Sequence, residues 1–585
     1  MTTTNRAGFA LPLTLVVIVA VVVLASAASL MSMTSVRVTS YYARQDRLAS
    51  AAQAGLEMAR ARVNADPAVY PDSGYVVLED EVDVTDALGN SIEGVTRSTY
   101  VGPVGITSGE YGVNGSIVSI TRDAGGATVV RRQHVAQESF ARFAYFTDIE
   151  PAHISFGGGD QIFGPVHTND ELKIYASGAT FHGPVSTARD IQGRGYGDFR
   201  NTVDEDANRI PMPQLADLMA LRAQAQAGGT AFAGDFAGAY GQATTRIEFV
   251  AVDLDGNGDT RGADEGFVRV YRSNDAAWVV GSGGIGNTMR ASRNCGDRHG
   301  GVFRSAAVHP SGGQPANAPV NDDWTAAVTS NSRACYLGGA PELFGGFVVN
   351  DGTGQWQRWN GPVDARLRAQ RGAEADYLFP ITRPLNPSFK GVIYVAGDVA
   401  VSGRLRGRVT VAAEGDIVIA DDVVYATNPA MGTCDDILGL FAGGDAIVAN
   451  TPINAPWRRS NNQAYFSYDD TTDEFIHAFV LTLNVFTVES YDDGSIRDER
   501  CEGDRIGRGC LYLTGGIIQS TRGAVGTQQN NGGTGYLKRY SYDACGATQP
   551  PPYFPTTGVF GRGARYDVDP NGFDVDAYYE QYTAG

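Results

Sequence analysis

The stretch Gly8-Phe9-Ala10-Leu11-Pro12 begins a segment without charged residues that extends to Met33. Since no charge lies between Arg6 and Arg37, the segment is long enough to cross a bilayer as a helix. Farther on, apolar residues recur at three-, four- or seven-residue spacing, namely Tyr41, Leu48, Ala52, Leu56, Ala59 and Val63. Because no proline interrupts the chain between Pro12 and Pro67, we expect one helix of roughly 50 residues.

A short polar leader that ends in Gly8 and is followed by Phe9 and an apolar helix resembles the prepilin leader of type IV pilins. The resemblance implies that the prepilin peptidase cuts between Gly8 and Phe9 at the inner membrane. It also implies that the mature helix packs among other major and minor pilins in a filament. The phrase Ala52-Gln-Ala-Gly-Leu-Glu57 is similar to the motif that closes this helix in large minor pilins of the PilX N-terminal family.

Two other interpretations of the apolar segment stay open. A secretory signal would be cut after Ala25-Ser26-Ala27, and a permanent anchor would not be cut at all. We favour the pilin interpretation because a cleaved signal gains nothing from a helix that continues beyond the membrane. Counted from Phe9, the fifth residue is Leu13, where major pilins carry a Glu that neutralises the amine of a neighbouring subunit. Within that family, the change implies a position at or near the pilus tip.

Composition indicates a large, mainly β, exported body on a helical stalk. The 585 residues include 73 glycines, and only 19% are charged. Six arginines against two acids give residues 1–64 a net charge of +4, so the whole-chain value of −19 leaves −23 for the rest. Such an acidic body repels nucleic acid at long range, and DNA binding would need a local basic patch.

Short repeated strands predict a β-solenoid, or β-helix, beyond a small antiparallel head sheet. Strands and a turn at 112–135 form a hairpin of that head. Gly-Pro-Val occurs twice, 19 residues apart, within 163–169 and 181–187. Gly397-Asp-Val-Ala-Val401 is repeated 18 residues later, and more loosely at 444–448. A repeat near twenty residues is typical of stacked solenoid turns, whereas an ordinary sandwich with similar turns is the alternative.

The expected fold class is therefore α+β and mainly β: a long pilin helix with a small sheet, plus a solenoid that carries an inserted β-rich domain. The expected boundaries are a leader at 1–8, the spine helix at 9–65, the β head at 66–150, a first solenoid segment at 151–195, an insertion at 196–387, and a second solenoid segment with the C-terminal region at 388–585. The insertion includes one predicted helix at 213–227, ended by two glycines.

A calcium loop is predicted within the insertion. Asp253, Asp255 and Asn257 match the alternating oxygen ligands of such loops, Asp259 follows, and Asp264 stands at the twelfth position. The flanking segments read as strands, so the loop is not part of a helix–loop–helix EF-hand. An acidic hairpin turn without a metal is the alternative.

The six cysteines fit disulfides formed in an oxidising compartment. They allow fifteen connectivities. We consider Cys501–Cys510, Cys295–Cys335 and Cys434–Cys545 as candidate pairs.

The sequence contains no catalytic motif that we recognise, so we expect no enzymatic activity. Three clusters combine basic residues with aromatic or turn residues and could bind DNA phosphates and bases. They are Trp457-Arg458-Arg459, Lys538-Arg539 with neighbouring tyrosines, and Arg404 with Arg406. The alternative is that these cations only balance an acidic surface.

The spine, the Gly-Pro-Val turns, the block at 391–425 and the segment Gly515–Val525 together resemble large minor pilins of the ComZ type. The resemblance implies a pilin with a β-solenoid grafted onto its head and a role in DNA capture for natural transformation. The precursor would reside in the inner membrane and the mature protein at the pilus tip on the cell surface. A structural or adhesive tip subunit that does not bind DNA is the competing function.

Overall fold

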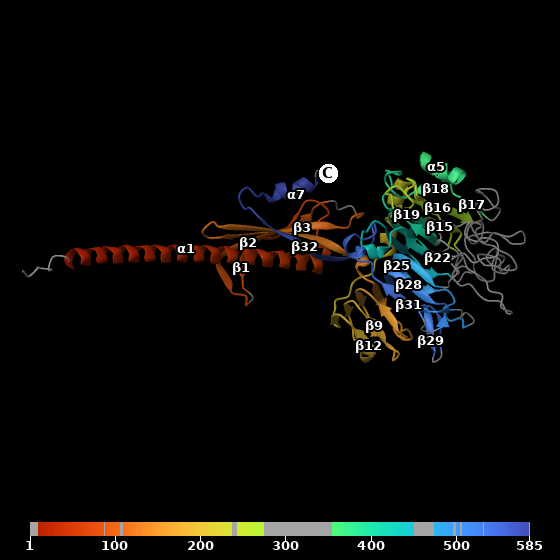
Figure 1. Ribbon diagram of the computed structural model, residues 1–585, viewed down its shortest axis with the longest axis horizontal. Helices are drawn as coiled ribbons and strands as arrows, with labels where there is room; N and C mark the ends of the chain where they lie inside the picture. The colour runs from red at the N-terminus through yellow and green to blue at the C-terminus, as the bar shows by residue number, and fades with distance from the viewer. Residues whose placement is uncertain are drawn as a thin grey trace, which may run out of the picture. The chain divides into compact units, whose positions relative to one another are not determined.

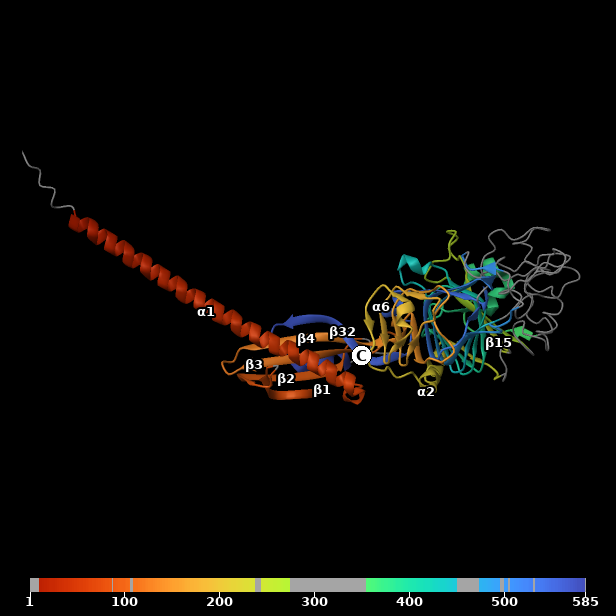
Figure 2. The same ribbon diagram turned by 90° about the horizontal axis from the view of Figure 1, so that it is seen from below.

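The structure is a computed structural model that describes residues 10–86, 88–105, 109–236, 243–273, 354–449, 473–494, 499–502, 506–529 and 532–583. The chain divides into two compact units. Unit 1 contains Met1–Thr107, Val113–Gln137 and Gly558–Gly585, and unit 2 contains Ser108–Gly112 and Glu138–Thr557. Each unit is described separately below (Figures 1 and 2).

The predicted spine is confirmed as one helix, α1 (Ala10–Ala65). From Leu11 onward it is long and apolar enough to cross a membrane. Its C-terminal half packs on a sheet, and Leu48, Ala52, Leu56, Ala59 and Val63 are all at most 4% exposed. Tyr41 also belongs to the predicted stripe but is 58% exposed, so the buried face begins one or two turns later than we expected.

Unit 1 has a five-stranded sheet in the order β1-β2-β3-β4-β32. The strands are β1 (Val76–Thr85), β2 (Ser91–Pro103), β3 (Asn114–Asp123), β4 (Thr128–Ser139) and β32 (Thr556–Val568). The predicted hairpin is confirmed as the antiparallel β3–β4 pair, in which Arg122 faces Thr128. Figure 2 shows these strands beside the C-terminal half of α1.

The C-terminal end of the chain completes this sheet, which the sequence did not lead us to expect. After β32 comes α7 (Val575–Thr583). Phe560, Tyr578 and Tyr579 from these elements are at most 7% exposed and pack into the apolar clusters of unit 1. The domain boundary at 388–585 was therefore wrong at its end, because residues from Gly558 onward belong with the head. The large unit 2 is inserted between β4 and β32.

Unit 2 consists mainly of short strands in parallel pairs. Those of its first part are β5 (Tyr145–Ile149), β6 (Asp160–Ile162), β7 (Val166–Thr168), β8 (Leu172–Lys173), β9 (Ala179–Phe181), β10 (Val185–Thr187), β11 (Ile191–Gln192), β12 (Gly197–Phe199) and β13 (Val203–Asp204). The offset of the Gly-Pro-Val repeat is also the offset of the strand pairing, since Val166 pairs with Val185 and Leu172 with Ile191. β5 belongs to this stack, so the head ends at Gln137 and not at residue 150.

The second part of unit 2 contains the longer strands. They are β19 (Val392–Ala396), β20 (Val399–Leu405), β21 (Arg408–Ala413), β22 (Ile417–Tyr425), β23 (Ile437–Ala442), β24 (Ala446–Val448), β25 (Glu474–Val488), β28 (Cys510–Thr521) and β31 (Leu537–Ser541). Two two-stranded sheets lie between them: β26 (Glu499–Arg500) with β27 (Ile506–Gly507), and β29 (Gly526–Gln529) with β30 (Gly532–Gly535). β19 pairs with β21, and β20 with β22, at an offset of 18 residues.

The two repeat blocks form one continuous stack. β28 pairs in parallel with β25 on one side and with β5 on the other, and β31 pairs with β6. Figure 1 shows the resulting succession β12, β9, β31, β28, β25 and β22. Apolar side chains from both blocks therefore share one core, from Phe156 and Phe181 to Val401 and Leu440.

The described strands of the expected insertion are also part of this stack. They are β14 (Ala231–Ala233), β15 (Thr245–Ala251), β16 (Gly266–Ser273), β17 (Gly354–Trp356) and β18 (Leu378–Pro380). β14 pairs with β19 and β15 with β20, both in parallel, whereas β16 pairs antiparallel with β15, β17 and β18. The boundary at 196–387 was therefore wrong as an inserted domain, because these strands extend the sheet by backbone hydrogen bonds.

The helix predicted at 213–227 is present as two shorter helices, α2 (Leu215–Met219) and α3 (Arg222–Gly228). Leu218, Leu221 and Ala225 are buried against Val392 and Tyr394 of β19. The helices thus cover an outer face of the strands, not an end of the stack. The remaining described helices of unit 2 are α5 (Ala365–Arg371) and α6 (Cys545–Thr548).

Candidate functional site

The N-terminal half of α1 is an exposed apolar rod. Leu11, Leu13, Val19 and Leu24 are each more than half exposed. An apolar surface of this length is not stable in water and needs a bilayer or other apolar helices around it. The predicted cleavage residues Gly8 and Phe9 lie outside the described residues.

The C-terminal half of α1 approaches the sheet most closely at Gly55. A Cβ atom there would lie 2.4 Å from Oγ of Ser119 on β3 and 2.6 Å from Cδ of Arg97 on β2. Arg97 is held in place because it donates to both carboxylate oxygens of Glu79 at 2.7 Å. Two residues later, Glu57 forms an ion pair of 2.9 Å with Arg562 of β32. The Ala-Gly-Leu-Glu motif therefore positions the helix on the sheet.

The predicted calcium loop lies at the tip of the β15–β16 hairpin. Carboxylate oxygens of Asp253, Asp255 and Glu265 lie within 4.8 Å of one another. The amides of Gly258 and Gly256 donate to Asp253 at 2.8 and 2.7 Å, and these bonds lower the pKa of its carboxyl. Such a group of hard oxygens is the donor set that calcium prefers.

Three of the predicted ligands have other partners. Asp264 forms an ion pair of 2.6 Å with Arg366 of α5, so its assignment as the twelfth-position ligand was wrong. Asp259 and Asn257 each accept a backbone amide of the same turn, at 2.9 and 2.8 Å.

Glu265 was not predicted as a ligand from the sequence. Its side chain is fully buried, and it accepts the amides of Leu254 at 2.7 Å and Gly262 at 2.6 Å. The signal in the sequence was that a glutamate, Glu265, directly follows Asp264, which we had counted as the twelfth loop position. The twelve-residue spacing of EF-hand loops did not identify Glu265, because that spacing holds for loops between two helices and this loop lies between two strands. The calcium assignment itself stays a prediction.

Three of the predicted DNA-binding cations are taken up by internal ion pairs. Lys538 binds Asp160 at 2.8 Å, Arg539 binds Glu502 at 2.8 Å, and Arg406 binds Asp436 at 2.9 Å. The side chains of these cations are at most 14% exposed. Each of these charges is already paired within unit 2, which argues against a phosphate-binding surface, and the assignment stays a prediction.

The remaining predicted DNA-binding residues are Arg404 and the cluster at 457–459. Arg404 lies on β20 and is half-buried. Trp457, Arg458 and Arg459 lie outside the described residues. The cluster at 457–459 is thus the one predicted DNA-binding cluster whose surroundings the described part of the chain does not cover.

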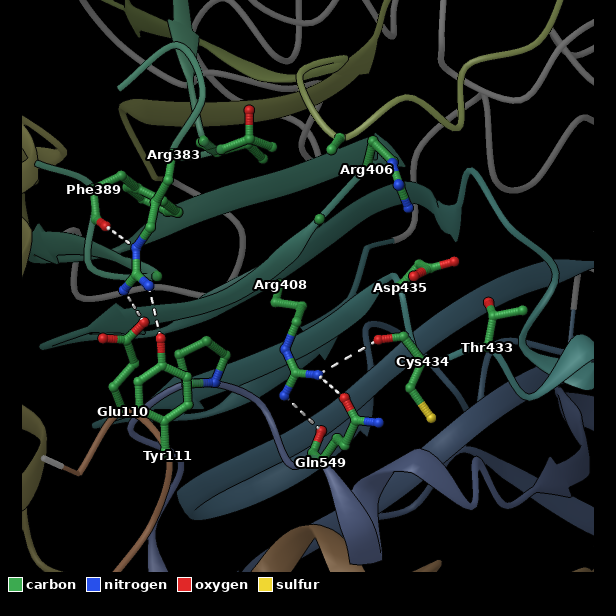
Figure 3. A pocket seen from close by; sticks show the side chains of 16 residues that line it. Glu110, Tyr111, Arg383, Phe389, Arg406, Arg408, Thr433, Cys434, Asp435 and Gln549 are labelled. Atoms are coloured by element: carbon green, nitrogen blue, oxygen red, sulfur yellow. Dashed lines mark hydrogen bonds and ion pairs between the residues drawn. The ribbon is translucent and has the colours of Figure 1, made fainter. Parts of the chain in front are cut away.

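Unit 2 contains a cavity of about 390 Å³ with Arg383 and Arg408 on its walls (Figure 3). Arg383 donates to the Tyr111 hydroxyl at 2.7 Å and pairs with Glu110, and the contact with Tyr111 raises the pKa of Arg383. Arg408 donates to the side chain of Gln549 at 2.6 Å and to its carbonyl at 3.0 Å, while burial lowers the pKa of Arg408. Because the guanidinium groups already bind the protein's own acceptors, we assign this cavity a structural role.

Two disulfides connect described residues of unit 2. Cys434 is bonded to Cys545, and Cys501 to Cys510, with Cα–Cα distances of 5.4 and 4.6 Å. Both pairs are among those that the sequence suggested. Cys295 and Cys335, the third candidate pair, lie outside the described residues. The Cys434–Cys545 bond fixes α6 against the loop before β23.

The Gly-Asp repeat places three carboxylates one above another. Asp398 accepts the amide of Asp416 at 2.7 Å, and Asp416 accepts the amide of Asp445 at 2.7 Å. Burial, opposed by the hydrogen bond from Asp445 and reinforced by the two neighbouring charges, raises the pKa of Asp416 to about 6. The repeated aspartates therefore link successive turns by hydrogen bonds from a backbone amide to a carboxylate, beside the backbone hydrogen bonds of the same turns.

No protein-family model matches the chain, and no curated protein matches it. Among solved structures, the chain is similar to the crystal structure of the competence-associated pilin ComZ from Thermus thermophilus. The match covers 89% of this chain and 95% of that one, at 13% sequence identity and a TM-score of 0.25. A likeness at this level transfers neither a fold nor a role.

Proposed function

We propose that the protein is a non-enzymatic minor pilin of a type IV pilus. The observation that carries the proposal is the division of α1 into an exposed apolar half and a half buried on an antiparallel sheet. A filament subunit needs both halves, because one packs among neighbouring helices and the other holds the exported body. A plain secretory signal needs neither the continuous helix nor the close approach at Gly55.

Leu13 supports a proposed position at or near the pilus tip. In a filament interior, an unpaired ammonium from a neighbouring subunit would be buried in apolar surroundings at a cost of several kcal/mol. Leu13 offers that ammonium no carboxylate. A subunit with no neighbour above it avoids this cost.

N-terminal sequencing of the protein from cells tests the pilin assignment. We expect the mature chain to begin at Phe9, and Gly8→Leu to leave the leader uncut and the protein in the inner membrane. A mature start near Ala28 would support a secretory signal instead.

For unit 2 we propose binding of extracellular DNA during natural transformation. Within the acidic body, Trp457, Arg458 and Arg459 are consecutive in the sequence, and these residue types bind phosphates and stack on bases. Binding through so small a patch should be weak, independent of sequence and steeply reduced by salt. A purely structural or adhesive tip subunit is the second candidate, favoured by the internal pairing of Lys538, Arg539 and Arg406.

A double variant distinguishes these two functions. Arg458→Ala with Arg459→Ala should lower DNA affinity and DNA uptake while pilus assembly continues. The matched control is Arg189→Ala with Arg200→Ala, since both side chains are more than 60% exposed and already pair with acids. Equal uptake in the two double variants would exclude the patch, and no DNA binding by the intact protein would favour the structural role.

A further inference from the structure

A second cleft, of about 410 Å³, lies in unit 2 apart from the cavity of Figure 3. Its walls come from the segment before β6, from Tyr175 after β8, from Tyr491 after β25, and from the chain between β28 and the start of β31. β29 and β31, labelled in Figure 1, mark its place in the stack. The volume falls in the range of small-molecule sites.

The charges of this cleft cancel. Among its described lining residues, Asp160 and Lys538 form an ion pair of 2.8 Å, and His153 is the other basic side chain. Asp160 is 3% exposed and also accepts the amide of Gly157 at 3.1 Å. The Lys538 ammonium lies 5.5 Å from the centre of the Phe156 ring. A charged ligand would therefore lack a free counter-charge here, which favours a neutral ligand.

Aromatic rings and hydroxyl groups form the rest of the lining. Tyr175 is 64% exposed at the rim, Tyr491 is partly buried against the core, and Tyr536 is 1% exposed. Ser155 adds an aliphatic hydroxyl, which can both donate and accept hydrogen bonds, and the hydroxyl of Thr527 binds that of Thr534 at 2.6 Å. The cleft thus presents flat apolar surfaces beside uncharged polar groups.

We propose that this cleft binds a neutral saccharide. A pyranose ring has one face of C–H groups, which packs on a tyrosine ring, and a rim of hydroxyls, which matches the hydroxyls of the lining. A nucleic-acid strand fits less well, because it brings a phosphate with every nucleotide and the one ammonium here is already neutralised by Asp160. The inference does not depend on the pilin assignment or on DNA binding.

The test uses the full chain in a detergent without a sugar headgroup. Maltohexaose, cellohexaose and mannohexaose are the neutral probes, and a heparin hexasaccharide and an oligothymidylate are the anionic ones. We expect at least one neutral probe to bind with a Kd of about 1 mM by calorimetry and saturation-transfer NMR. Tyr175→Ala should weaken that binding about tenfold, and Tyr175→Phe should weaken it less because the ring stays.

Tyr196→Ala is the matched control, since Tyr196 is 54% exposed and does not line the cleft. Its affinity should stay within about twofold of the unmodified protein. Three results would overturn the proposal. They are the absence of binding by every neutral probe at about 10 mM, an unchanged affinity in Tyr175→Ala, and binding of the anionic probes alone.

Discussion

At the scale of single residues, the acidic side chains of unit 2 differ in what surrounds them. Glu150 is fully buried and pairs with Arg522 at 3.0 Å. Asp253 accepts backbone amides at a hairpin tip, and Asp416 lies between two other carboxylates. The consequences differ: the charge of Glu150 is neutralised, Asp253 belongs to an oxygen cluster that can accept a cation, and ionisation of Asp416 is unfavourable. Two of these cases give direct predictions.

The loop at Asp253 should bind one calcium ion. Calorimetry with calcium chloride should show a single site that is lost in Asp253→Ala, because that carboxylate belongs to the three-oxygen cluster. Asp264→Asn is the control and should keep the site, since Asp264 is engaged with Arg366. Equal melting temperatures with calcium and with a chelator would show that the motif is only a turn.

Asp416 should make unit 2 less stable as the pH rises. Its folded pKa of about 6 is above its ordinary value of 3.8, so the protonated native form is favoured at low pH. This contribution to stability is fully present below pH 3.8 and is lost as the pH rises through about 6. Asp416→Asn, whose Oδ1 can still accept the Asp445 amide, should therefore stabilise the protein at pH 7.5 by about 1 kcal/mol after discounting for partial exposure.

Thermal melts at pH 7.5 and pH 4 measure this difference. The stabilisation should shrink towards zero at pH 4, because Asp416 is then largely protonated. Asp435→Asn, at an exposed residue before β23, is the control and should have little effect at either pH, since surface substitutions usually change stability by less than about 0.5 kcal/mol. A loss of stability in Asp416→Asn at pH 7.5 would contradict the assignment.

At the scale of elements, α1 and the β3–β4 hairpin could be predicted because their signals are local. An unbroken apolar run and a spaced stripe define the helix, and a Gly-rich turn joins two β-branched runs. The pairing of β28 with β5 has no such local signal, since Ile517 pairs with Tyr145, hundreds of residues earlier in the chain. The same limit applies to Glu265, whose place in the loop depends on the register of β15 with β16.

Gly55 gives a prediction for the contact between helix and sheet. In an exposed helix, Gly→Ala stabilises by about 1 kcal/mol. Here the added methyl group would overlap Ser119 and a fixed Arg97, so Gly55→Ala should destabilise unit 1 by about 1–3 kcal/mol. Hydrogen exchange of the β2 and β3 amides measures the loss.

Ala54→Ser serves as the control, because Ala54 is the exposed neighbour of Gly55 on the same helix. Exchange in that variant should stay close to that of the unmodified protein. Slower exchange in Gly55→Ala would mean that the helix does not approach the sheet as described.

At the scale of the whole molecule, the fold class could be predicted from the sequence, but the order in which the chain forms the strands of each sheet could not. Composition and repeats indicated a helix, a small sheet and stacked strands, and the structure has these parts. The order in which the chain builds them is different, because β32 returns to the first unit after the stack is complete. No composition change marks that return, and the segment at 556–568 reads as one more strand.

The last prediction concerns β32, through which the chain returns to the sheet of unit 1. Phe560 is 1% exposed and its ring centre lies 4.6 Å from that of Tyr70. Phe560→Ala should destabilise unit 1 by about 3–4 kcal/mol, because it leaves a cavity in a shared core. Limited proteolysis should then cut the β1–β4 region first while fragments of unit 2 persist. Tyr582→Ala, at a side chain that is 38% exposed, should not change the pattern.

The placement of β32 also has a consequence for biosynthesis. A ribosome delivers β4 long before β32, and the whole of Glu138–Thr557 must be made in between. During that interval the edge of β4 has unpaired amides and carbonyls, which in other proteins invite wrong pairing. The sheet of unit 1 can therefore be completed only after the last residues have been made, so a stalled or truncated product is recognisable by an open edge strand.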